Sequence, residues 1–286
     1  MAQTKDFLTV GELYAALEAR MPRSLSCDWD RDGLSFCPDT EARVTGVIIA
    51  LDPTEDAISL ARETGCNVLL THHPLIFHGL TAINGGDVVS RRVLSLAAAG
   101  ISAMSFHTRL DAVAGGVNDV LAGLLGLEDV IPFGEAPSDG IPIGRIGLLP
   151  EVIDMETFTD RLSEVLSVPP AWEDGEITAH LTPARPPIQY AACDRAVHRV
   201  AVLGGGGDDE VEAARAAGAD TYVTGELKYH QLCDAPFGDM NLISAGHYFT
   251  EFPVCRQLGR WVSEIASAAG TSVPLHVLSG VRTRTK

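Results

Sequence analysis

The chain has 286 residues, 46% of them hydrophobic, and a formal net charge of −17. This length is enough for about two domains with separate cores, and the acidic surface would repel nucleic acid, which we therefore do not expect as a partner. No stretch reaches the ~20 apolar residues of a membrane span and residues 1–6 contain no apolar signal core, so we expect a cytoplasmic protein without a membrane partner. The six cysteines form no Cys-x-x-Cys pair, so we expect a reducing compartment, no disulfides and no zinc ribbon.

The first third of the chain alternates predicted helices with predicted strands. Thr9 and Glu12 form a capping box that starts a helix ending before Pro22. Trp29 then lies in a polar loop, and we expect it to plug the core beneath that loop. Uncharged runs further along predict buried strands with helices between them, which is typical of parallel α/β units. The strands are expected at residues 44–51, 66–70 and 101–106, and the helices at 55–65 and 88–99.

Two adjacent histidines, His72 and His73, follow the predicted strand 66–70, at a point where Pro74 prevents the strand from continuing. Side chains alternate faces along a strand, so neighbouring imidazoles can converge only where the strand breaks. The ends of parallel strands are where open α/β sheets place their ligands, and imidazole is the commonest metal ligand. We interpret the pair as half of a metal site; the alternative is two surface histidines on a loop.

The next predicted strand also delivers an imidazole. His107 follows residues 101–106, and Asp111 stands four positions later. A short helix is expected at residues 120–127, and residues 131–142, with several prolines, glycines and acids, form the candidate linker between two halves.

The second half repeats the alternation of strands and helices. Asp154 caps a predicted helix, and a closing helix reaches about residue 269. His247 follows the last predicted strand, again with a carboxylate, Glu251, four positions later. Strands are expected at residues 194–203, 221–223 and 242–245, and the glycines at 204–207 are expected to turn from a strand into a helix.

The two halves resemble each other in sequence. Sliding the chain by 153 positions lays residues 44–78 over residues 197–231 without a gap, and the histidine pair then falls on Gly225 and Glu226. We expect two related α/β lobes, related by an approximate two-fold axis, whose strand ends face one cleft, because clefts between domains are preferred ligand sites.

A second correspondence strengthens the repeat. A shift of 140 positions lays His107 over His247 and Asp111 over Glu251, and each pair has the form His-x-x-x-acid after an apolar strand. A likeness of composition among α/β units is the alternative explanation, and it accounts for the helices better than for these paired motifs.

Together the strand ends supply imidazoles and carboxylates in a number that exceeds what one tetrahedral zinc ion needs. They suit two divalent ions about 3.5–4 Å apart with a bridging carboxylate, a site that lowers the pKa of bound water and supports metal-assisted hydrolysis. Nitrogen and oxygen donors favour zinc, iron(II) or manganese. An imidazole outside the coordination spheres would serve as a general acid–base. The pooled residues are His72, His73, His107, Asp111, His247 and Glu251.

Other motifs point to function less clearly. The glycines at 204–207 fail the dinucleotide fingerprint because Asp209 stands at the third glycine position, and Asp208 beside it would repel phosphate. No serine has nucleophile-elbow spacing. The segment of Lys228, Tyr229 and His230 is open to two interpretations, substrate contact or plain surface.

The motifs in order resemble the NIF-three-like dinuclear metal-centre proteins, a family often labelled GTP cyclohydrolase I type 2 homologues. The resemblance covers nearly the whole chain. It rests on five segments: Trp29-Asp30 with Gly33-Leu34, residues 71–77, His107-Thr108 with Leu110-Asp111, Thr224-Gly225-Glu226 with His230, and Gly246-His247-Tyr248 with Thr250-Glu251. Arg31 departs from the asparagine that the family often has there, and the spacing leaves no room for the extra domain of many bacterial members.

The resemblance implies two interlinked α/β lobes with mixed sheets flanked by helices, which we divide at residues 1–130 and 131–286, with the final helix packing on the first lobe. It implies a toroidal hexamer and two divalent metal ions per chain. The implied function is a metal-dependent hydrolase of a small or nucleotide-like substrate, and the alternative is a non-catalytic metal-storage, metallochaperone or regulatory ring. The implied ligands are His72, His73, Asp111, His247 and Glu251, with His107 close by. We choose Glu251 as the bridging ligand and assign His107 as the acid–base group.

Overall fold

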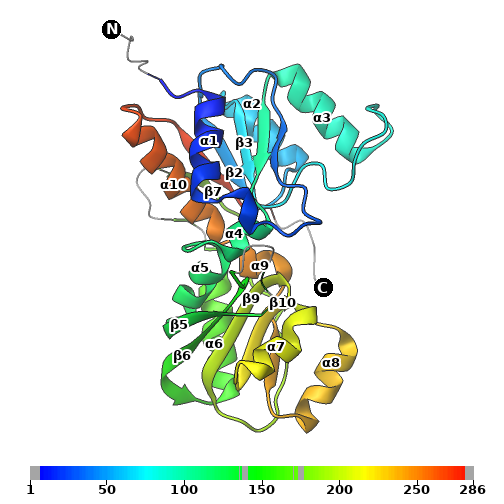
Figure 1. The fold of residues 1–286 in the computed structure, drawn as a ribbon, viewed down its shortest axis with the longest axis vertical. Helices are drawn as coiled ribbons and strands as arrows, with labels where there is room; N and C mark the ends of the chain where they lie inside the picture. The colour runs from blue at the N-terminus through cyan, green and yellow to red at the C-terminus, as the bar shows by residue number, and fades with distance from the viewer. Residues whose placement is uncertain (1–6, 135, 137–140, 170, 173–176, 281–286) are drawn as a thin grey trace.

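The computed structural model describes residues 7–134, 136, 141–169, 171–172 and 177–280. They form two α/β lobes joined at a narrow waist, each built on a six-stranded mixed sheet flanked by helices (Figure 1). The predicted fold class is therefore confirmed. Among the described helices, none is long and apolar enough to cross a membrane.

The first lobe has five parallel strands and one antiparallel edge strand, β1. Its central strands are buried along their whole length, as uncharged β-branched runs require when helices cover both faces of a sheet. In spatial order the strands are β1 (Gly33–Phe36), β4 (Ser102–Ser105), β3 (Val68–Thr71), β2 (Val47–Ala50), β12 (Leu275–Leu278) and β7 (Ile177–His180).

Alternate side chains of these strands enter two separate cores. Ile48 and Leu69 pack towards α2 (Glu55–Thr64) and α3 (Val88–Ala99). Ile49 and Leu70 face the opposite side, where α1 (Val10–Arg20) and α10 (Val254–Ala268) lie together. The predicted capping box starts α1, and glycines in the left-handed region end α2 and α3 as expected.

The second lobe has three parallel strands, β9, β10 and β11, flanked by antiparallel neighbours. In spatial order the sheet is β5 (Glu128–Phe133), β6 (Gly144–Ile153), β9 (Val197–Gly206), β10 (Thr221–Glu226), β11 (Asn241–Ser244) and β8 (Gln189–Ala191). The remaining elements are α4 (Thr108–Ala112), α5 (Val117–Leu125), α6 (Met155–Leu166), α7 (Val211–Ala216), α8 (Tyr229–Asp234), α9 (His247–Glu251) and the 3₁₀ turns η1 (Arg23–Leu25), η2 (Asp208–Glu210) and η3 (Ala235–Phe237).

The internal repeat predicted from the sequence corresponds to a repeat of strands. β2, β3 and β4 lie side by side in parallel, and so do β9, β10 and β11, in the same spatial order. The helices α4 and α9, which carry the two His-x-x-x-acid motifs, follow β4 and β11 and lie at the waist between the lobes (Figure 1).

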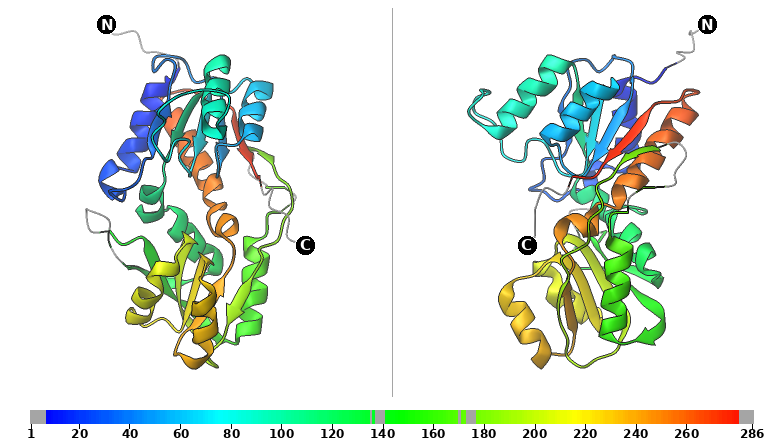
Figure 2. Two further views of the ribbon diagram at one scale, coloured as in Figure 1. Left: turned by 90° about the vertical axis from the view of Figure 1, so that its right-hand side faces the viewer. Right: turned by 180° about the vertical axis from the view of Figure 1, so that it is seen from behind.

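The two lobes are interlinked. β7 and β12 come from the second half of the chain but complete the first sheet, and α10 runs from the waist into the first lobe beside α1 (Figure 2). The helix α5, from the first half, packs on β6 and β9 of the second sheet. The division at residue 130 stays a prediction about domains, but the sheets themselves do not follow it.

Several short strands were not predicted, and the predicted turn at the glycines was wrong. The glycines at 204–206 are not a turn, because they extend β9. The candidate linker at 131–142 was also wrong, because residues 131–133 belong to β5, which pairs with β6 in the second sheet rather than joining the lobes. Residues 135 and 137–140 of the segment lie outside the described part of the chain. β1, β7, β8 and β12 have three or four residues each, which is too short for alternation to be recognised.

Candidate metal centre

The structure brings all six predicted side chains together at the waist. His72 and His73 follow β3, and His107 follows β4. Asp111 lies in α4, while His247 and Glu251 open and close α9. Strand ends from both lobes thus meet at one point, as the repeat predicted.

Glu251 lies at the centre of this cluster. Its Oε1 is 3.5 Å from His72 Nε2, and its Oε2 is 3.2 Å from both His73 Nε2 and His247 Nε2. Asp111 Oδ1 lies 3.7 Å from His72 Nε2 on the Oε1 side. The two oxygens of Glu251 therefore face two different sets of donors.

The donor atoms form three groups in which every atom lies within 4.8 Å of the others. Glu251 belongs to two of these groups, one with His72 and Asp111 and one with His73 and His247. A third group joins His72, His73 and His107. Two positions that share one carboxylate are what a pair of bridged divalent ions requires.

Each of the four imidazoles is oriented through its other ring nitrogen. Because carbonyl and carboxylate oxygens only accept hydrogen bonds, each Nδ1 must carry a proton, and in the neutral form of each ring Nε2 then offers a lone pair. The Nδ1–H of His72 donates to the Phe106 carbonyl (3.0 Å), and that of His73 donates to Asp52 (2.8 Å). The Nδ1–H of His107 donates to Asp30 (3.0 Å), and that of His247 donates to Glu226 (3.0 Å).

Three buried polar atoms of the cluster have no hydrogen-bond partner within the described residues. They are His72 Nε2, Asp111 Oδ1 and Glu251 Oε2. A buried polar atom without a partner is costly and rare, and such atoms on both sides of the Glu251 carboxylate are what a bound cation would satisfy. Imidazole nitrogens and carboxylate oxygens are donors for divalent transition metals, so the residues present fit such ions.

The electrostatics of the cluster support the same conclusion. Burial lowers the pKa of His72. Burial also acts against a charged His73, but its hydrogen bond to Asp52 and the neighbouring Glu251 carboxylate outweigh burial and raise the pKa of His73 to about 10. Burial and the nearby Glu251 raise the pKa of Asp111 well above its usual value. Protons and a divalent cation compete for these same atoms.

Glu251 itself is held ionised. Burial opposes its charge, but the contacts with His72, His247 and His73 outweigh that opposition and keep the pKa of its carboxyl well below the usual value. A buried carboxylate that stays charged among imidazoles is a strong anchor for a cation.

Two glycines of the repeat make room for Glu251. Gly205, at the end of β9, has φ +72°, and a side chain there would collide with Glu251. A Cβ on Gly225 would come 2.6 Å from the Cα of His247. The glycine run therefore lets the backbone of β9 and β10 approach α9, which is a role that the sequence reasoning missed.

The partners of the imidazoles were also missed. Asp52 directly follows the predicted strand 44–51, and it occupies the position that matches Gly205 in the repeat. Glu226 occupies the position of His73. The match of Glu226 to His73 was a signal available in the sequence, whereas Asp52 falls on a glycine and its match gave none.

The prediction for Trp29 was wrong. Its side chain is 55% exposed and lies beside the cluster, with ring centroids 5.9 Å from His107 and 6.0 Å from Phe77. The core beneath the loop is filled instead by Phe106 and by the fully buried Arg109, whose guanidinium lies over that ring and pairs with Asp32.

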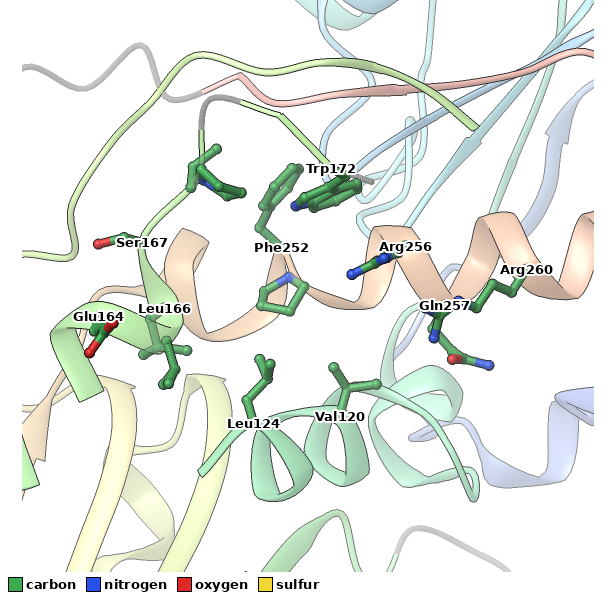
Figure 3. A pocket seen from close by; sticks show the side chains of 14 residues that line it. Val120, Leu124, Glu164, Leu166, Ser167, Trp172, Phe252, Arg256, Gln257 and Arg260 are labelled. Atoms are coloured by element: carbon green, nitrogen blue, oxygen red, sulfur yellow. The ribbon is translucent and has the colours of Figure 1, made fainter. Parts of the chain in front are cut away.

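Two other features lie apart from the six residues. Lys228 pairs with Asp208 and Asp209 at the start of α8, and Tyr229 is exposed. A groove of about 400 Å³ lies along α10, with Trp172 and Phe252 on one side and Val120 on the other (Figure 3). Neither feature contains a residue of the cluster.

Comparisons with known proteins agree with this arrangement. The family model described as Duf34/NIF3 (NGG1p interacting factor 3) matches residues 8–281. A Streptomyces coelicolor protein named GTP cyclohydrolase 1 type 2 homolog is 32% identical over 275 residues, covering 94% of this chain and 90% of its own. A Clostridium acetobutylicum protein of the same name is 29% identical over 274 residues, covering 94% and 95%. The fold is similar to that of a Bacillus cereus protein related to NIF3, with a TM-score of 0.79 over 98% of both chains at 22% identity.

Proposed function

Because this chain belongs to the Duf34/NIF3 family, we propose that it is a dinuclear metal-dependent hydrolase of a small or nucleotide-like substrate. The observation that carries the proposal is Glu251, which is shared by two groups of donors whose imidazoles are all held through Nδ1. Such outer partners fix ligand orientation and are typical of metal sites.

In this proposal each ion would have two ligands of its own, and the two ions would share a third. His72 and Asp111 would hold the first ion, His73 and His247 would hold the second, and Glu251 would be their shared ligand. The donor set of nitrogen and oxygen favours zinc, iron(II) or manganese. Bound ions of this kind act as Lewis acids and lower the pKa of water, which is the chemistry of metal-assisted hydrolysis.

His107 serves as the acid–base group. Its Nδ1–H donates to Asp30, so Nε2 is free to take a proton from water or to give one to a leaving group. Asp30 is fully buried, and despite that burial its hydrogen bonds with His107 and Thr108 hold its pKa far below the usual value. An ionised Asp30 stabilises the imidazolium that forms during transfer, as the carboxylate of a catalytic triad does.

The relatives' name makes GTP the first substrate to test. Opening of the purine imidazole ring is a hydrolysis, in which water adds to a ring carbon, a C–N bond breaks, and the ring nitrogen takes up a proton. His107 Nε2 is the group that we assign to that proton transfer. The cluster is accessible for it, because the side chains of His107, His73 and His247 are 17%, 21% and 37% exposed.

We also propose that the chain works as a homo-oligomer, a toroidal hexamer, in the cytoplasm. The six cysteines are free, which suits a reducing compartment. Exposed Val130 and Ile131 on the edge strand β5 suit contact with another copy. Light scattering of the purified protein would measure the mass, and a monomer would contradict the ring.

Elemental analysis and a turnover assay on the same sample test the main proposal. We expect about two metal ions per chain and GTP hydrolysis that a chelator abolishes and added metal restores. Two ions without turnover of GTP or other nucleotides would favour the non-catalytic storage or metallochaperone alternative. A protein that takes up no metal after reconstitution would contradict both.

A further inference from the structure

Two large aromatic side chains lie exposed at the mouth of the metal centre. Trp29 is 55% exposed and Phe77 is 41% exposed, and their ring centroids are 6.0 Å apart at an interplanar angle of 59°. Both rings also lie beside His107, at 5.9 Å for Trp29 and 6.3 Å for Phe77. Exposed apolar surface next to a cluster of polar donors indicates a ligand contact.

The two rings are held in place by their neighbours in the chain. Asp30, next to Trp29, accepts hydrogen bonds from Thr108 N (3.0 Å) and Thr108 Oγ1 (2.6 Å) in the first turn of α4. Phe77 lies two positions after the buried Leu75, in the segment that begins with the paired histidines. Both aromatic side chains are therefore anchored to the same elements that carry the donor atoms.

The arrangement of the rings favours a flat ligand. His107 stands edge-on to both Trp29 and Phe77, with interplanar angles of 72° and 80°. A flat ring stacked on the exposed Trp29 side chain would lie close to both Phe77 and His107, because each of their ring centroids is about 6 Å from the indole. The His107 ring is itself 5.1 Å from the His72 ring and 5.6 Å from the His73 ring, so only one imidazole separates the aromatic pair from the donor atoms.

We propose that Trp29 and Phe77 form a stacking subsite for a planar heteroaromatic ring of the substrate. This inference rests on the proposed function, because the ring belongs to the molecule that reacts at the metal centre. Stacking on an aromatic side chain tolerates any flat base, since every base has a π-face. The subsite therefore selects the class of heteroaromatic compounds rather than one member of it.

Binding of the uncharged nucleoside guanosine to the zinc-loaded, full-length protein tests the subsite without requiring turnover. Trp261 is 6% exposed, but Trp172 is only partly buried and lines the groove along α10, so the quenching that is lost in Trp29→Phe is the part that reports on Trp29. We expect saturable quenching, and no quenching with ribose 5-phosphate, which lacks the ring. Calorimetry then compares the variants, since Trp29→Ala removes the reporter.

The variants isolate the contribution of stacking. We expect Trp29→Ala and Phe77→Ala to raise the Kd for guanosine about 5-fold or more, and Trp29→Phe to recover most of the affinity. Phe237→Ala is the matched control, because Phe237 is an exposed aromatic residue in η3 and should leave the Kd unchanged. Zinc content should be the same in all four variants, since none of these side chains is a donor.

Two outcomes would overturn the inference: wild-type protein that does not bind guanosine, or alanine variants that bind it as tightly as wild type. If those variants also lose mass in light scattering, the rings contact a second copy instead. Guanosine binding that depends on Trp29, without turnover, would leave the subsite standing and remove the hydrolase. Turnover with KM unchanged in both alanine variants would leave the hydrolase standing and remove the stacking subsite.

Discussion

Gly205 lies directly behind Glu251, in the space that a side chain would need to coexist with the carboxylate. We expect Gly205→Ala to displace Glu251 and to reduce the metal content of both positions, because Glu251 belongs to both groups of donors. Elemental analysis of the purified variant measures this. The backbone strain of alanine at positive φ adds a cost of roughly 1–2 kcal/mol in stability.

Gly65→Ala is the matched control for that strain. Gly65 has the same φ of +72°, but no atom lies within 4 Å of the position of its Cβ. Both variants should lose similar stability in denaturant unfolding, and only Gly205→Ala should lose metal. Equal metal content in the two variants would contradict the role assigned to Gly205.

The shared position of Glu251 predicts the stoichiometry of metal loss. We expect Glu251→Gln to lose both ions, because it weakens both groups of donors, and Asp111→Asn to lose one. His73→Ala should also lose one ion while the chain stays folded. Elemental analysis with circular dichroism on each variant measures both properties. A full complement of metal in Glu251→Gln would exclude this residue as the bridging ligand.

The partners of the imidazoles should tune metal affinity without being ligands. Asp52→Ala removes the acceptor that orients His73, and Glu226→Ala removes the acceptor that orients His247. We expect each to weaken metal binding about 10- to 100-fold in competition with a chelator. Glu63→Ala, an exposed acid on α2, removes the same charge away from the cluster and should have no effect. Affinities that match this control would show that the Nδ1 contacts are incidental.

His107 should act in proton transfer rather than in metal binding. We expect His107→Ala to lower turnover about 10²- to 10⁴-fold with metal content unchanged. Asp30→Asn keeps the shape of the side chain but removes the charge that stabilises the imidazolium, so kcat should fall while KM changes little. Loss of metal in His107→Ala would instead assign this residue to the third group of donors as a ligand.

Much of the cluster could be predicted from the sequence because its residues stand at strand ends. His72, His107 and His247 each follow a short apolar run, and the repeat placed those runs in two similar lobes. The periodicity and the caps also located α1, α2 and α3 within about two residues.

The interlinking of the two sheets could not be predicted from the sequence in the same way. β12 and β7 take their places through pairing with strands that are distant in sequence, and short runs carry no information about their partners. The prediction for Trp29 failed because a large aromatic side chain is normally buried, whereas this one is 55% exposed beside His107.

The pairing of β12 with β2 also has a consequence for biosynthesis. Residues 47–50 pair with residues 275–278, so one edge of β2 stays open while the intervening segment leaves the ribosome. An open apolar strand edge in a nascent chain is a site for wrong pairing. The first sheet is therefore completed only when residue 278 has been made, and chaperone protection of the unfinished chain matters most in the interval before that.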